Sequence, residues 1–297
     1  MKRFSTVFLL GCIAAASCKQ ASHVDSPKEW IQLFNKNDLA GWDIKIAKHP
    51  LNDNFNNNFL VKDGILKVDY SGYLKFDGEF GHLYYKEPFS YYIVRVEYRF
   101  TGEQLEGGPG YARLNSGLML HSQSASSVGI NQSFPVSLEM QLLASDEKEI
   151  RPTCNLCTPG TEVSMKGKPI HDHCINSSSK SYPANEWITA EAIVLGDSIQ
   201  HLVNGDTVLA YEKTRIGGGF VNEDFTWTSG GFGADSLLWI KKQGTPLKTG
   251  YIALQAESHP VEFRKVELLN LEGCMDKKAL NYKSYFVKAD NAKCKYK

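Results

Sequence analysis

Alternation between apolar and polar side chains is the main pattern along this chain. From Val94 to Phe100 every second residue is apolar, and the residues between them are charged. A period of two is typical of a strand with one buried face, so residues 91–100 are predicted to form one. The dipeptides Asp63-Gly64 and Asn204-Gly205 separate further short apolar runs and predict tight hairpin turns.

The same pattern predicts most of the remaining strands. They cover residues 117–121, 136–143, 187–195, 198–203, 207–211, 250–255 and 261–271. Segments with a helical period are nearly absent, so the pattern predicts an all-β, antiparallel sandwich in which one sheet curves into a groove. Residues 144–185 and 213–249 interrupt the strands, and we expect these long segments to rim one end or edge of that groove.

Composition narrows the class of protein. The chain has 297 residues, 42% of them hydrophobic, which is enough to build a packed core. Its 33 basic residues match its 33 acidic ones, so it lacks the positive field by which a protein follows nucleic acid. We therefore expect no nucleic-acid partner.

The first residues have the features of an export signal. Lys2 and Arg3 precede a short apolar run that ends in small residues before Cys18, so residues 1–17 are predicted to be a signal peptide. The Ala-Ser-Cys ending looks like a lipoprotein cleavage site with acylation of Cys18, while Cys12 and a plain cleaved signal are the alternatives. Residues 18–28 would then link the anchor to the domain. We expect a lipoprotein of the bacterial envelope, in the periplasm or at the outer membrane, that touches membrane only through this anchor.

Export also changes the interpretation of the cysteines, because an oxidising compartment favours disulfides. Cys274 and Cys294 bracket the polar tail, residues 272–297, and are expected to pair. A second group consists of Cys154, Cys157, His171, His173 and Cys174. Thiols and imidazoles at this spacing could hold zinc, but we favour a disulfide from Cys174 to either Cys154 or Cys157.

Six stretches of the chain follow one another in a characteristic order. They are WIQLFNKNDLAGW (30–42), VKDGIL (61–66), NSGLMLHS (115–122), VSLEMQLL (136–143), ANEWITAEAIVLGDSIQHLVNGDTVLAYE (184–212) and GYIALQAESHPVEFRKVEL (250–268). Together they resemble the 3-keto-disaccharide hydrolase family. The resemblance implies a concanavalin-like β-jelly-roll over residues 29–271 that acts on oxidised sugars. This chain departs from the family at the end of the NSG strand, where it has His121 in place of the usual Arg.

Glu139 is the first candidate for catalysis. In residues 138–142 the apolar side chains alternate with Glu139 and Gln141, so these two should face the groove if the apolar set faces the core. An acid among apolar neighbours has a raised pKa and can act as a base near neutral pH. The resemblance supports this position, and the alternative is a solvated glutamate on the outer face.

Histidines and polar residues of neighbouring strands could complete the site. By alternation His121 and His201 can point into the groove, where they would act with Glu139 as acid and base or as ligands of a divalent metal. The resemblance suggests Gln255 as a groove residue. Gln141, Gln255, Glu257 and His259 are the expected sugar contacts, and Arg264 has either a structural or a substrate role.

These residues and the resemblance lead to an expected activity, the cleavage of a 3-keto-glycoside by elimination and hydration. Glu139 would be the base, and the net result would be hydrolysis. A carbohydrate-binding sandwich without catalysis is the alternative. Direct hydrolysis is a third, and it would need a second carboxylate, which Glu257 or Asp235 would have to supply.

Overall fold

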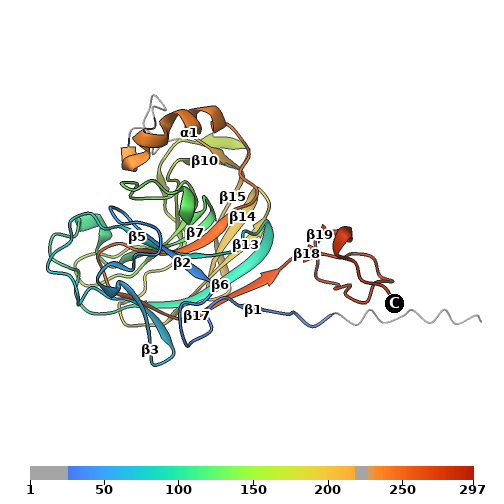
Figure 1. Ribbon diagram of the computed structural model, residues 1–297, viewed down its shortest axis with the longest axis horizontal. Helices are drawn as coiled ribbons and strands as arrows, with labels where there is room; N and C mark the ends of the chain where they lie inside the picture. Colours follow the sequence, from blue (N-terminus) through green and yellow to red (C-terminus); the bar gives the residue numbers. More distant parts are fainter. Residues whose placement is uncertain (1–25, 218–226, 228) are drawn as a thin grey trace, which may run out of the picture.

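Two antiparallel sheets packed face to face form the body of the protein, and a small tail extends from one end (Figure 1). We describe the fold from a computed structural model that covers residues 26–217, residue 227 and residues 229–297. The predicted signal peptide with Cys12 and Cys18, and part of the segment 213–249, lie outside the described residues. The all-β sandwich expected from the sequence is confirmed.

The larger sheet has ten strands. In spatial order they are β11 (Lys168–Ile170), β10 (Thr161–Met165), β15 (Asp206–Ile216), β14 (Ser198–Val203), β13 (Ile188–Leu195), β6 (Tyr91–Phe100), β17 (Val261–Asn270), β4 (Ile65–Val68) and β3 (Phe59–Lys62), with β1 (Ile31–Gln32) also paired to β17. The predicted strands at 91–100 and 198–203 match β6 and β14 in full. The turns at Asp63-Gly64 and Asn204-Gly205 connect paired strands, as expected.

The smaller sheet has seven strands and carries the candidate site. Its order is β12 (Cys174–Ile175), β9 (Asn155–Cys157), β8 (Leu138–Leu143), β7 (Asn115–Ser122), β16 (Tyr251–Ala256), β5 (Gly81–Tyr85) and β2 (Trp42–Ile46). Short 3-10 turns occur at η1 (Phe55–Asn57), η2 (Gly110–Ala112), η3 (Ala125–Ser127), η5 (Ser229–Asp235) and η6 (Asn291–Lys293), and one short helix, α1, spans Ser236–Lys242.

The core lies between the two sheets, and strand alternation determines which residues enter it. Val94, Val96, Tyr98 and Phe100 of β6 are fully buried there, together with Leu138, Met140 and Leu142 of β8. Because one side chain in two is committed to the core, the others must leave on the opposite face of each sheet.

The outer face of the ten-stranded sheet is covered by ion pairs. Arg95 of β6 bonds to Glu191 and Glu267 on the flanking strands. Arg264 pairs with Glu97 and lies 4.7 Å from the ring centroid of Trp187. Of the two roles considered for Arg264, structural and substrate-binding, these contacts support the structural one.

The segment 144–185 is not the long loop that its composition predicts. It contributes β9 and β12 to the seven-stranded sheet and β10 and β11 to the ten-stranded one. Each of these strands has two to five residues, too few to show a period in the sequence. As expected, the segment forms an edge of the sandwich, beside β8.

The tail, residues 272–297, is held by the predicted disulfide between Cys274 and Cys294. Its two short strands, β18 (Glu272–Gly273) and β19 (Lys288–Ala289), pair with each other and with neither large sheet. Among the described residues, no helix has the length and apolar character needed to cross a bilayer.

Replacing Cys274 and Cys294 together by serine should loosen the tail and leave the sandwich intact. In the chain-entropy model a loop of this size is stabilised by about 3 kcal/mol, and the tail has little apolar core to compensate for its loss. Limited proteolysis with mass analysis should therefore show faster cleavage within 275–293 and unchanged resistance of the body. Equal proteolysis of tail and body in the variant would contradict this separation.

Candidate functional site

The outer face of the seven-stranded sheet carries a group of buried polar side chains. Glu139 of β8 lies between Met119 of β7 and Cys157 of β9, and two residues further on Gln141 lies between Gly117 and Asn155. Strand alternation places Glu139 and Gln141 on this face because Leu138, Met140 and Leu142 occupy the core. The two residues therefore lie on the groove face of the sheet, as alternation predicts.

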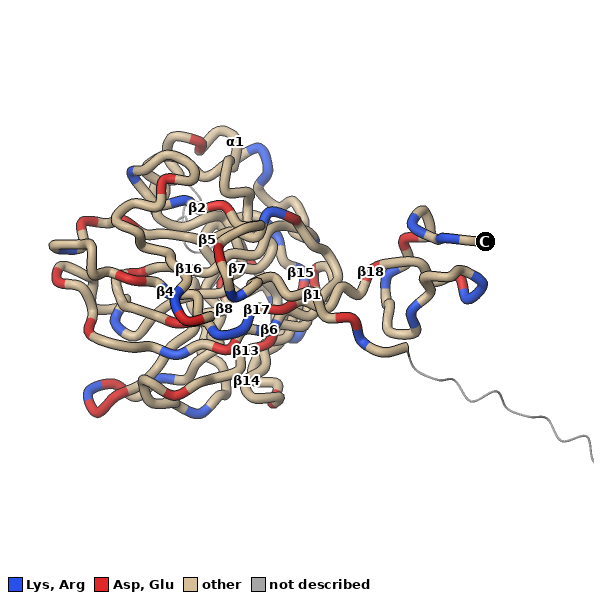
Figure 2. The backbone as a smooth tube through the Cα atoms, turned by 60° about the horizontal axis from the view of Figure 1, so that its bottom comes forward, with Lys and Arg blue, Asp and Glu red and all other residues tan. Residues whose placement is uncertain are grey.

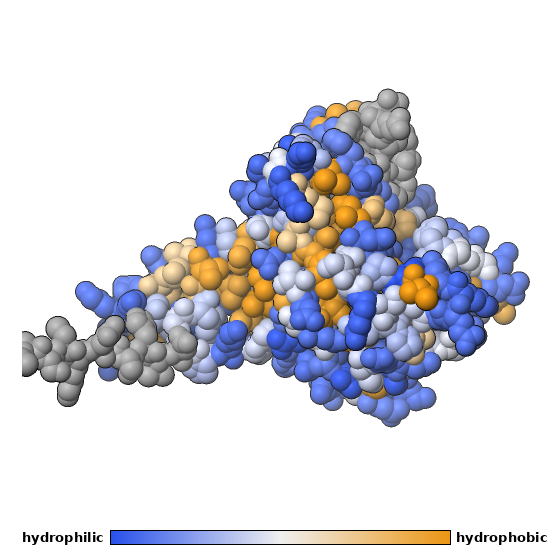
Figure 3. All heavy atoms as spheres, turned by 180° about the vertical axis from the view of Figure 1, so that it is seen from behind, coloured by the Kyte–Doolittle hydropathy of each residue, from blue (hydrophilic) through white to orange (hydrophobic). Residues whose placement is uncertain are grey.

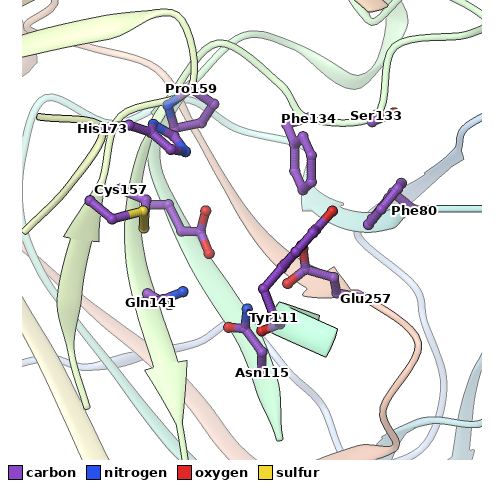
Figure 4. A pocket seen from close by; sticks show the side chains of 12 residues that line it. Phe80, Tyr111, Asn115, Ser133, Phe134, Gln141, Cys157, Pro159, His173 and Glu257 are labelled. Atoms are coloured by element: carbon purple, nitrogen blue, oxygen red, sulfur yellow. Dashed lines mark hydrogen bonds between the residues drawn. A yellow bond between two sulfur atoms is a disulfide. The ribbon is translucent and has the colours of Figure 1, made fainter. Parts of the chain in front are cut away.

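A cavity of about 460 Å³ opens over this face. Figure 4 shows Glu257, Tyr111, Phe80 and Phe134 on one side and Cys157, His173 and Gln141 on the other. The remaining lining residues are Asn115, Ser133, Glu139, Pro159 and Cys174. Of the described residues that line it, none is a lysine or an arginine, so its charge comes from carboxyl groups.

Glu139 and Glu257 are two buried carboxyl groups that share this cavity. Burial raises the pKa of Glu139 to about 8. Burial, and then the neighbouring charge of Glu139, raise the pKa of Glu257 well above its usual range. Two such groups without a counter-charge cannot both ionise easily, so near neutral pH the pair retains at least one proton. Once Glu139 ionises, at about pH 8, the site can supply Glu139 as a base and the still protonated Glu257 as an acid.

Gly117 makes room for the Glu139 carboxyl group. A Cβ atom at residue 117 would lie 2.7 Å from Glu139 Oε1 and 2.9 Å from both Glu139 Cγ and Met119 Cε. Any larger residue would force Glu139 to move further into the cavity. The glycine thus determines where the carboxyl group sits.

Tyr111 and Asn115 are site residues that the sequence reasoning missed. Tyr111 lies in η2, and burial followed by the charges of Glu257 and Glu139 raises the pKa of its hydroxyl. Its hydroxyl is therefore a neutral hydrogen-bond donor close to both acids. Asn115 donates through Nδ2 to the Tyr111 carbonyl at 3.1 Å, while its buried Oδ1 has no partner among the described residues. Phe80 and Phe134, with ring centroids 4.8 Å apart, were also missed.

Gln255 continues the polar group on β16. It is opposite His82 of β5, and the register of β16 with β7 puts it beside Gly117. Three buried atoms here, Nε2 and Oε1 of Gln255 and Nε2 of His82, have no hydrogen-bond partner within the described part of the chain. Buried polar atoms normally have partners, so these point to a polar ligand or to ordered water.

A disulfide between Cys157 and Cys174 joins β9 to β12 and forms one wall of the cavity. This confirms the favoured pairing of Cys174. His173 precedes Cys174 and lines the same wall, and burial lowers its pKa to about 4, so its ring is neutral at neutral pH.

The zinc site considered as the alternative for this group is not supported. Among the described residues, the one group of metal-ligand side chains with its atoms within 4.8 Å is Cys157, His173 and Cys174. Its two sulfur atoms are bonded to each other, so they are not thiolates and cannot bind a metal as such. His171 is exposed and outside this group. Cys154 is the free cysteine of the described residues and is fully buried in the core, where burial raises the pKa of its thiol to about 12.

His121 does not join Glu139, which corrects our expectation. Strand β7 has one extra residue opposite β16 between Met119 and Ser122, and His121 adopts a φ of 48° there. This bulge breaks the alternation and turns the ring toward the other sheet. His121 Nε2 donates to the Gly196 carbonyl at 2.7 Å, in the turn between β13 and β14.

His201 is also a core residue rather than a groove residue. Its Nδ1 donates to the Cys154 carbonyl at 3.0 Å, and the Tyr211 hydroxyl donates to its Nε2 at 2.9 Å. Burial lowers its pKa to about 4, so both ring nitrogens are engaged in a neutral ring. Neither histidine can therefore be a metal ligand or an acid–base partner of Glu139 in this arrangement.

The remaining candidates differ in position. Glu257 lines the cavity, as expected for a substrate contact or for the second carboxylate. His259 does not line it and instead packs edge-on against Phe100, with ring centroids 5.7 Å apart. Asp235 ends η5 near Gly129 and is likewise outside the cavity lining, which leaves Glu257 as the partner of Glu139.

Comparison of the sequence with models of known protein families identifies one matching family. The family model of the 3-keto-alpha-glucoside-1,2-lyase-like domain matches residues 29–269. No curated protein sequence matches the chain.

Solved structures with low sequence identity also match. A Parabacteroides distasonis ATCC 8503 protein provisionally assigned as a glycosyl hydrolase is 19% identical, with a TM-score of 0.46 over 82% of this chain and 94% of that one. The carbohydrate-binding module CBM66 of Bacillus subtilis is 8% identical, with a TM-score of 0.39 over 83% and 99%. A Z. galactanivorans LamA variant in complex with laminaritriose and laminaritetraose is 10% identical, with a TM-score of 0.43 over 82% and 98%.

The raised pKa of Glu139 predicts how stability depends on pH. An unfolded glutamate loses its proton near pH 4.5, whereas the folded state keeps it until about pH 8, so the folded state binds more protons in this window. Its contribution to stability therefore falls as pH rises from 4.5 to 8. The free energy of unfolding of Glu139→Gln should nearly match that of the parent near pH 4.5 and exceed it at pH 8.5 by about 4 to 5 kcal/mol, since each unit of pKa difference is worth about 1.4 kcal/mol.

Urea unfolding at the two pH values measures this difference. Glu147→Gln is the matched control, because Glu147 is exposed and its substitution should leave the pH dependence unchanged. The same pH dependence in Glu139→Gln and in the parent would show that Glu139 ionises normally.

Proposed function

Because this chain belongs to the 3-keto-alpha-glucoside-1,2-lyase-like family, we propose that it cleaves 3-keto-glycosides by elimination, followed by addition of water. The observation that carries the proposal is the buried pair Glu139 and Glu257 in one cavity without a cationic side chain among its described lining residues. Such a pair provides a base and a proton donor in the same cavity, which are the two groups that an elimination requires.

Glu139 is the base in this mechanism. A ketone at C3 acidifies the hydrogen on C2, because the electron pair left behind delocalises onto the ketone oxygen. The Glu139 carboxylate removes this proton, the C2–H electron pair forms a C1–C2 double bond, and the bond from C1 to the glycosidic oxygen breaks. A base whose pKa is about 8 accepts the proton more readily than an ordinary glutamate would.

Glu257 is the matching acid. In its protonated form it donates its proton to the departing glycosidic oxygen, so that an alcohol leaves rather than an alkoxide. The products are that alcohol and an unsaturated 3-keto sugar. Addition of one water molecule across C1–C2 returns the saturated 3-keto sugar, which makes the net reaction a hydrolysis.

Other lining residues would bind and orient the sugar. The Tyr111 hydroxyl and the Gln141 amide can donate to the ketone oxygen, where negative charge develops as the proton leaves. Phe80 and Phe134 offer apolar ring surface for one face of the sugar. Gln255, a predicted sugar contact, is fully buried next to Gly117 and does not line the cavity, so its unpartnered amide could meet a sugar hydroxyl only if the site opens toward it.

The pair of carboxyl groups leads to an expected kinetic result. Purified chain should consume a 3-keto-disaccharide and leave the unoxidised parent sugar untouched, because only the ketone acidifies C2–H. Glu139→Gln should lower kcat by about a hundredfold or more with little change in sugar binding, since glutamine cannot accept the proton. Glu257→Gln should also lower kcat, and product analysis by mass spectrometry and NMR would follow each reaction.

Glu147→Gln serves again as the control and should leave kcat unchanged. Addition of a chelator tests separately for a divalent metal. Consumption of neither sugar, with retained sugar binding, would identify a carbohydrate-binding sandwich instead. Equal cleavage of both sugars would indicate direct hydrolysis, and unchanged kcat in Glu139→Gln would exclude this residue as the base.

The disulfide in the cavity wall should also matter for activity. Replacing Cys157 and Cys174 together by serine removes the covalent link between β9 and β12, so that the wall with His173 is held by strand pairing and by the hydrogen bonds that Thr158 donates to the His173 carbonyl. We expect KM to rise by about tenfold while the sandwich stays folded, because the wall positions substrate rather than taking part in proton transfer. The matched control is the double serine variant of Cys274 and Cys294, whose KM should equal that of the parent.

A further inference from the structure

The tail differs in charge from the rest of the chain. It contains seven of the 33 basic residues but only three of the 33 acidic ones. Figure 2 shows lysine positions distributed along the tail, up to the C-terminus. Within a protein whose total charge is zero, this is a local positive surface.

Exposed apolar side chains lie among these lysines. Met275, Leu280, Val287 and Tyr296 are 40%, 64%, 55% and 58% exposed. The Leu280 amide donates to the Lys295 carbonyl at 2.8 Å, and the Tyr296 hydroxyl donates to Asp276 at 2.7 Å, close to Lys278 in sequence. The view in Figure 3 likewise shows apolar and hydrophilic atoms side by side over this end of the molecule. At these exposures, the part of the sandwich that the structure describes leaves these side chains open to solvent.

The first described residues are bound to this same tail. The Ser26 amide donates to Ser284 Oγ at 2.8 Å, and the Ser284 amide donates to Ser26 Oγ at 3.1 Å. Glu29 forms an ion pair with Lys283. Ser26 lies eight positions after Cys18 in the sequence, and eight extended residue steps span at most about 29 Å. If Cys18 carries the expected lipid, the tail must stay within that distance of the bilayer.

We propose that the tail, residues 272–297, is a docking surface for an anionic lipid bilayer. Lysines such as Lys278, Lys295 and Lys297 would meet the negative headgroups, while Leu280, Met275 and Val287 enter the interface. Aliphatic side chains interspersed with lysines fit a bilayer interface better than they fit a hydrated polysaccharide. This docking is independent of the reaction proposed for the cavity on the seven-stranded sheet.

Lysine acetylation read by mass spectrometry tests the proposal on the purified full-length chain. The chain is mixed with vesicles of phosphatidylcholine alone, with vesicles containing phosphatidylglycerol, or with alginate as a soluble anionic polysaccharide. Lys278, Lys295 and Lys297 should be protected by the anionic vesicles alone, and the protection should disappear at high salt. Exposed lysines of the sandwich, such as Lys62 and Lys148, report non-specific shielding.

Variants distinguish docking by the tail from mere proximity. Replacing Lys278, Lys295 and Lys297 by glutamine should weaken binding to the anionic vesicles about a hundredfold. Each lysine near an anionic surface contributes roughly fivefold to the affinity, and three are removed. The matched variant with glutamine at Lys62, Lys148 and Lys166, all exposed on the sandwich, should behave as the parent. Equal acetylation of the tail with and without anionic vesicles, or protection by alginate and not by vesicles, would overturn the proposal.

Discussion

Face-to-face packing of the two sheets is the constraint on which the candidate site depends. The inner faces share a continuous apolar core that includes Leu138, Met140 and Leu142 of β8. Once these residues are committed to the core, the period of two forces Glu139 and Gln141 onto the opposite face. There the loops that carry Tyr111, Phe134 and Glu257 complete the cavity. The core thus orients the catalytic candidates without touching the substrate.

Burying the two carboxyl groups of the site costs free energy, and the stability of the rest of the fold compensates for this cost. Two carboxyl groups are buried in one cavity, and burial raises the pKa of both. A charged carboxylate in such surroundings is unfavourable unless it is paired, and the described lining residues include no cation that would pair with it. Proteins tolerate such an arrangement where the altered proton affinity is useful. The large core, the ion pairs outside the ten-stranded sheet and the disulfide in the cavity wall together provide a scaffold for it.

The histidines show how one local irregularity changes a functional interpretation. Strict alternation would place His121 beside Glu139, but one extra residue in β7 turns it toward Gly196 on the other sheet. His201 follows the alternation of β14, but this places its side chain on the face of the sheet that packs in the core. There a carbonyl and a hydroxyl group form hydrogen bonds with both ring nitrogens. Both are structural parts of the interior. His173, named from the sequence only as a zinc ligand, is the histidine that lines the cavity.

By itself the sequence determined the sandwich, its long strands, the Cys274–Cys294 pair and the face of β8 that carries Glu139, because periodicity and turn residues are local properties of the chain. Only the tertiary structure decided which residues meet. Glu257, which directly follows β16, meets Glu139 of β8 across β7, and Cys157 rather than Cys154 pairs with Cys174 because β9 and β12 are adjacent. The fold also brings together four residues from separate elements: Phe80 just before β5, Tyr111 in η2, Asn115 at the start of β7 and Phe134 in the loop before β8. Such contacts depend on strand order, register and bulges, and these are properties of the assembled sheets that no short stretch of sequence contains.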